Sequence, residues 1–190
     1  MKPDFQRALM PRDDALHLIG ALNAMKDKLP DAAQRWELLD ENGHVPVAPS
    51  YTALLQHATD AQDLSREVLR LADAFARSPH HTTRTGRIVL KQLATAATIS
   101  SHAAPHFTET AEAALTLPRT TSPTDRHYLT NRMVIDHASA RAFLRRASES
   151  LRDAAKELDD HLGVQRFLAP LTHREGPPEP PPSRPGGLHR

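Results

Sequence analysis

A seven-residue repeat between residues 123 and 167 limits the fold more than any other feature of the sequence. The repeat has two alternating positions, both on one edge of a helix. The first position holds His137, Leu144, Leu151 and Leu158, and the second holds Met133, Ala140, Ala147 and Ala154. This spacing is typical of a long helix packed against another helix, and the alanines let the partner approach closely. We therefore expect antiparallel, coiled-coil-like packing in an all-α protein.

The composition supports this fold class. Aromatic residues make up only 4% of the chain and there are only 7 glycines, which disfavours sheets and barrels. A chain of 190 residues is long enough to bury a core as one domain, and it has no cysteine for disulfides or thiolate metal sites. The formal net charge of +1 leaves no overall field to attract nucleic acid or an anionic membrane.

Apolar periodicity predicts three long helices, at about residues 50–77, 83–117 and 123–167. Ser50 is a suitable N-cap for the first of these, and Pro105 should kink the second. Together they predict an antiparallel helical bundle.

Two shorter helices are expected before residue 50. Pro30 should end the first of them. Asp31 should cap the second, which would bury Trp36 and Leu39 and stop at Asn42 and Gly43. The bundle domain should span residues 1–169, followed by a disordered, proline-rich tail at 170–190.

The sequence shows no secretory signal and no run of about 20 apolar residues, so we expect a cytoplasmic protein without membrane contact. We also expect no organic cofactor, because no dinucleotide fingerprint or related catalytic motif is present. Whether the chain is an enzyme stays open. Our first hypothesis is a non-enzymatic interaction or scaffold module, which binds a protein partner or a second copy through a helix face or through residues 176–187.

A metal-dependent enzyme is one alternative function. The chain has 12 histidines, and His102, His106 and Glu109 have the spacing that places three ligands on one face of an ideal helix. Asp136 or His137 could join them if the helices come together. The competing interpretation is a solvated helix surface, since two histidines without an established third ligand are a weak motif.

His137 lies on the apolar edge of its segment and should be buried, which favours its neutral form. It could set the helix register through a hydrogen bond, or it could be a pH-sensitive or catalytic group.

Nucleic-acid or phosphate binding is the other alternative function. Arg77, Arg84, Arg87 and Lys91 fall in a stretch without acidic residues that runs from Ala74 to Thr108. Arginine at a helix start is electrostatically unfavourable unless an anion binds there. The competing interpretation is a solvated loop and first helical turn.

Overall fold

The computed structural model describes residues 10–172, which form helices and connecting segments only. The helices are α1 (Arg12–Arg35), α2 (Tyr51–Ala76), α3 (Arg84–Ser101), α4 (Ala103–Thr116) and α5 (Pro123–Thr172), with short 3₁₀ helices η2 (Pro79–Thr82) and η3 (Leu117–Arg119). The predicted all-α class is confirmed. Within this part of the chain, no helix has the length and apolar character needed to cross a lipid bilayer.

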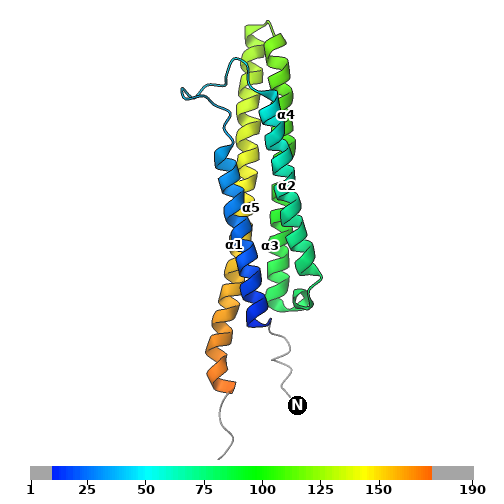
Figure 1. Ribbon diagram of the computed structural model, residues 1–190, viewed down its shortest axis with the longest axis vertical. Coiled ribbons are helices and arrows are strands. Elements are labelled where there is room, and N and C mark those ends of the chain that lie inside the picture. Colours follow the sequence, from blue (N-terminus) through cyan, green and yellow to red (C-terminus); the bar gives the residue numbers. More distant parts are fainter. Residues whose placement is uncertain (1–9, 173–190) are drawn as a thin grey trace, which may run out of the picture.

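The helices run up and down in a bundle with four positions (Figure 1). α3 and α4 follow one another along a single position, and α5 packs against both of them and against α1. α2 packs on the other side of α3 and α4. Since the chain reverses direction between α1, α2, the position shared by α3 and α4, and α5, the helices that pack against one another in neighbouring positions are antiparallel.

The repeat in α5 is buried as predicted. Met133, Leu144, Leu151 and Leu158 are completely buried, as are the three alanines between them, and His137 is 3% exposed. α5 is the longest helix of the described chain, with 50 residues, and its edge supplies a large part of the core.

α1 does not end at Pro30, contrary to our expectation, but continues to Arg35. A proline inside a helix leaves the carbonyl four residues earlier without its usual N–H donor. Here the hydroxyl of Ser148 on α5 donates to the carbonyl of Lys26 at 2.7 Å, which satisfies that carbonyl. The missing hydrogen bond is thus replaced by a contact from another helix.

The predicted second short helix, at 31–42, is wrong. Its first residues belong to α1, and the rest form an irregular connector at 36–50. The carboxylate of Asp40 accepts hydrogen bonds from the backbone N–H groups of Asn42 and His44, which holds a turn where a helix was expected. Trp36 is buried as predicted, but Leu38 is buried in place of Leu39.

α2 begins where the sequence predicts, with the Ser50 hydroxyl accepting from the N–H of Ala53. The helix predicted at 83–117 is instead divided at His102 into α3 and α4. Hydroxyls before the break bond back to the chain, from Ser100 to the Ala97 carbonyl and from Ser101 to that of Thr98. The expected bend is therefore a one-residue interruption at His102, whose backbone stays in the right-handed helical region, with Pro105 in the first turn of α4. Of the tail predicted at 170–190, residues 170–172 instead continue α5, and the rest lies outside the described residues.

Candidate metal centre

The upper part of the α4–α5 interface brings together one imidazole and two carboxylates. His106 and Glu109 lie one turn apart on α4, and Asp136 faces them from α5. One ligand atom from each of the three side chains lies within 4.8 Å of the other two. The Nδ1 atom of His106 is 3.3 Å from Oδ1 of Asp136 and 3.7 Å from Oε2 of Glu109. Both carboxylates therefore approach the same ring nitrogen.

Asp136 is the buried member of this cluster, with only 8% of its surface exposed. Its Oδ2 atom is buried and accepts no hydrogen bond from the described residues. Arg132, one turn earlier on α5, places its Nε 3.5 Å from this oxygen, which is an ion-pair distance without hydrogen-bond geometry. A buried carboxylate with an unfilled lone pair is costly and is suited to accept a cation.

His102 does not join the cluster. It lies at the junction of α3 and α4, and its ring nitrogens are not among the ligand atoms that converge. Its ring instead packs against Phe143 of α5, with the ring centroids 5.3 Å apart. Phe143 also stacks on the ring of His106 at 5.5 Å, which fixes the plane of that imidazole.

A second group of histidines lies in the core directly behind this cluster. The rings of His57 (α2) and His137 (α5) are 6.0 Å apart, and both contact Phe107. Nδ1 of His57 and Nε2 of His137 are buried and have no hydrogen-bond partner in the described chain. Trp36 stacks on His57 at 5.4 Å and closes the group on its outer side.

Burial keeps both histidines neutral. It is the main cause that lowers the pKa of His137 to about 4, and the charge of Arg141 and the repulsion that a protonated His57 would add act in the same direction. Burial likewise lowers the pKa of His57. The hydrogen bond proposed for His137 from the sequence is not formed at Nε2, and His57 was missed, although its position between Leu54 and Ala61 on the apolar stripe of α2 could have indicated it.

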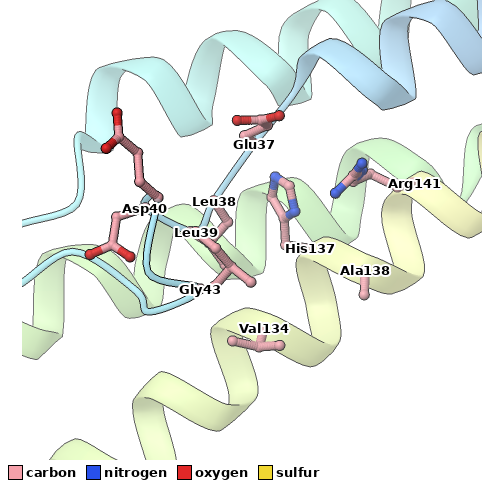
Figure 2. A pocket seen from close by; sticks show the side chains of 10 residues that line it. Glu37, Leu38, Leu39, Asp40, Gly43, Val134, His137, Ala138 and Arg141 are labelled. Atoms are coloured by element: carbon pink, nitrogen blue, oxygen red, sulfur yellow. The ribbon is translucent and has the colours of Figure 1, made fainter.

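A pocket of about 390 Å³ opens beside His137, between the connector at 37–43 and α5 (Figure 2). Figure 2 shows Glu37 of the connector close to His137, with Arg141 further along the helix, whereas the carboxylate of Asp40 points away from both. Arg141 is held by a hydrogen bond from its Nε to the carbonyl of Ala33, near the end of α1. Burial lowers the pKa of Arg141.

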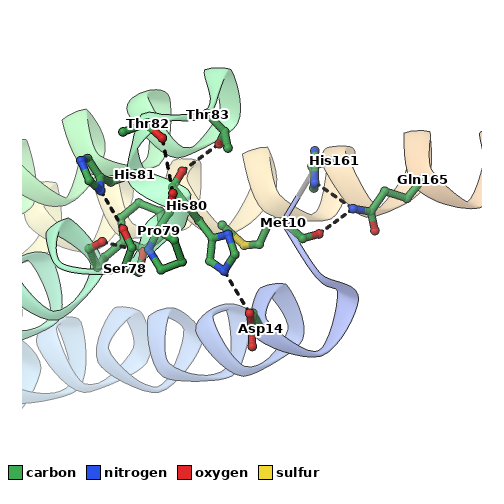
Figure 3. A network of polar contacts seen from close by, with 11 residues as sticks. Met10, Asp14, Ser78, Pro79, His80, His81, Thr82, Thr83, His161 and Gln165 are labelled. Atoms are coloured by element: carbon green, nitrogen blue, oxygen red, sulfur yellow. Dashed lines mark hydrogen bonds and ion pairs between the residues drawn. The ribbon is translucent and has the colours of Figure 1, made fainter. Parts of the chain in front are cut away.

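The basic segment is placed at the opposite end of the bundle, around η2 and the start of α3. Arg77 pairs with Asp73, and the neighbouring His80 pairs with Asp14 of α1 at 3.0 Å (Figure 3). Arg84, Arg87 and Lys91 are exposed along α3 and form no ion pair with other residues of 10–172. Three of the four predicted cations thus form one exposed row.

No protein-family model, no curated protein and no solved structure matches this chain. The site must therefore be judged on its own geometry. Of the arrangements described above, the cluster of His106, Glu109 and Asp136 has the most specific chemistry.

Proposed function

We propose that the protein binds a divalent transition-metal ion through His106, Glu109 and Asp136. The observation that carries this proposal is the convergence of three ligand atoms from two helices within 4.8 Å, one of them from a buried carboxylate that lacks a hydrogen bond on Oδ2. Helical bundles often hold metal ions in this way, through carboxylates and histidines on facing helices.

The distances favour a small ion with short bonds. Two ligands about 2.1 Å from a tetrahedral ion lie about 3.4 Å from one another. The two separations from Nδ1 of His106, 3.3 and 3.7 Å, are close to this value. The two carboxylate oxygens also lie within 4.8 Å of each other, so all three groups can bind one ion with small side-chain movements.

The ligand types favour a transition metal over magnesium or calcium. An imidazole nitrogen suits Zn²⁺, Co²⁺, Ni²⁺ or Fe²⁺, whereas Mg²⁺ and Ca²⁺ prefer oxygen ligands alone. The two carboxylates supply two negative charges and balance a divalent ion. Three protein ligands leave a coordination position open, which is the arrangement of catalytic rather than structural zinc sites.

Calorimetric titration of the metal-free full chain with Zn²⁺, and absorption spectra with Co²⁺, test the proposal. We expect one ion per chain, and a stabilisation of about 2.7 kcal/mol when free metal is 100 times the dissociation constant. Asp136→Asn keeps the shape of the side chain but removes its charge, and should abolish binding.

Glu112→Gln is the matched control, because Glu112 is exposed on the same helix one turn beyond Glu109 and lies outside the cluster. It should bind metal like the unaltered chain. Binding that survives Asp136→Asn, or no stoichiometric binding at all, would show that His106 and Asp136 form only an ion pair.

As a second candidate function, an interaction role is supported by the outer face of α5. Tyr128 and Ile135 are 66% and 63% exposed, and their spacing of seven residues places them on the same face. Sedimentation velocity over a range of concentrations should show self-association that Ile135→Asp removes. A chain that stays monomeric, with no partner lost on Ile135→Asp, would count against this role. Any contribution of the tail at 176–187 lies outside the described residues.

A further inference from the structure

We propose that the metal-loaded centre binds a small oxyanion, a carboxylate or a phosphate, held between the ion and Arg132. This inference rests on the proposed metal site and names the class of ligand that the site takes. It is carried by the position of Arg132, by the charge of the loaded centre and by the open side of the cluster.

The position of Arg132 allows its guanidinium to move away from Asp136 when a metal ion binds there. Its Nε is 3.5 Å from Oδ2 of Asp136 without forming a hydrogen bond, and 43% of its side chain is exposed. It makes no other ion pair within residues 10–172. A metal ion bound to the same carboxylate would repel the guanidinium, whose planar set of N–H donors would then point to solvent beside the ion.

Loading with metal reverses the charge of the centre. With His106 neutral, as a metal ligand must be, the two carboxylates and Arg132 together carry one negative charge. A divalent ion changes this to one positive charge. An oxyanion restores neutrality, and a partly buried site gains more from this than an exposed one would.

The cluster is open on the side where such a ligand would enter. The side chains of His106 and Glu109 are 31% and 45% exposed, whereas that of Asp136 is 11% exposed. The ion would therefore lie between a buried oxygen on its inner side and accessible ligands on its outer side. The open coordination position then faces solvent, next to Arg132.

Phe143 bounds, on the inner side, the space beside the metal ligands in which the anion would bind. Its ring stacks on His106 with an angle of 17° between the planes and closes the side toward the break at His102. The room that remains lies toward Arg132 and Glu109, which suits a ligand with a compact anionic group.

The experiment uses the full chain loaded with Co²⁺, whose visible spectrum reports a new ligand on the ion. Inorganic phosphate and acetate are added separately as the two probes. We expect either or both to change the spectrum of the loaded chain, and calorimetry to detect no anion binding to the metal-free chain. The tighter probe identifies phosphate or carboxylate as the source of the oxyanion.

Arg132→Gln should weaken anion binding by tenfold or more while leaving Co²⁺ affinity unchanged or higher, because a competing cation is removed. The matched control is Arg152→Gln, another exposed arginine of α5 far from the centre, which should bind both metal and anion normally. Co²⁺ binding without any anion effect, or an anion affinity that Arg132→Gln does not change, overturns this inference and leaves the metal site intact. Absence of Co²⁺ binding overturns both.

Discussion

The buried edge of α5 differs between its two halves. From Ala140 to Leu158 the repeat positions hold only leucine and alanine, all of them completely buried. From Met133 to His137 it carries two buried polar side chains, Asp136 and His137. All three buried polar side-chain atoms without a hydrogen bond in the described chain, on His57, Asp136 and His137, lie at this upper level.

We infer from this difference that the lower half of α5 serves mainly stability, whereas the upper half serves the proposed metal site. An unsatisfied buried polar group costs about 1–3 kcal/mol, so a bundle built only for stability would repeat its lower half throughout. The upper half loses stability at the level where the ligands of the candidate metal centre meet. In this interpretation the lower half stabilises the bundle, and the upper half holds the residues that would bind the metal ion.

The largest effect should come from the lower half. Leu151→Ala removes a completely buried side chain and should lower the free energy of unfolding by about 2–5 kcal/mol. Ile135→Ala, at a 63% exposed position of the same helix, should change it by less than about 0.5 kcal/mol. Urea unfolding measures both variants, and equal effects would show that the edge of α5 is not the main support.

The free energy of unfolding, measured as a function of pH, tests the burial of His137 in the upper half of α5. The pKa of His137 is about 4 in the folded chain, against an ordinary value of 6.5. The unfolded chain therefore binds more protons between these values, so stability is complete above about pH 6.5 and falls as the pH decreases toward 4. The loss attributable to His137 should be on the order of 3 kcal/mol.

His137→Leu should remove this loss, and the difference between the stability curves of the two proteins isolates it from the titration of carboxyl groups. His57 remains in the variant and should keep a smaller dependence of the same sign, since its pKa is also lowered. Parallel curves for the two proteins would mean that His137 is accessible to protons in the folded chain.

The contact between Ser148 and Lys26 predicts an intermediate effect. Ser148→Ala leaves the Lys26 carbonyl without a donor, because Pro30 cannot supply one, and should cost about 1–3 kcal/mol. Pro30→Ala restores the N–H, so the double variant should be less destabilised than Ser148→Ala alone. Additive effects of the two substitutions in thermal or urea unfolding would exclude this coupling.

The exposed row on α3 should give the smallest change in stability. Arg84→Ala with Arg87→Ala should alter the free energy of unfolding by less than about 0.5 kcal/mol, because both side chains are exposed. If the row contacts three phosphates of duplex DNA, affinity should fall about 40-fold between 50 and 200 mM salt. The double variant should flatten that dependence, and negligible binding by the unaltered chain would remove the nucleic-acid hypothesis.

The elements that were predicted correctly depend on local pattern. The Ser50 cap and the repeat of α5 are read from neighbouring residues, and both are present in the structure. The N-terminal helices were predicted wrongly because the hydrogen bond that keeps Pro30 inside α1 comes from a residue 122 positions away from its acceptor. Such a contact has no signature in the local sequence.

The same limit applies to the candidate centre. The spacing of His106 and Glu109 identified two of its members, but Asp136 could be named only as a possible addition, since its approach depends on how α4 packs against α5. His102 was included because it lies four residues before His106, but spacing along one helix does not show which side chains converge with Asp136, and its ring packs on Phe143 instead.

The break at His102 leaves the rotational phase of the buried face unchanged. Leu93 and Ser100 of α3 and Phe107 and Ala114 of α4 follow one another at steps of seven residues, and all four are buried. The orientation of α3 therefore continues into α4, with Phe107 in the core and the partly exposed His106 beside it, facing Asp136. One residue inserted at this point would turn every side chain of α4 by about 100° relative to α3. The candidate metal centre therefore depends on α3 and α4 keeping one common phase along the unbroken α5.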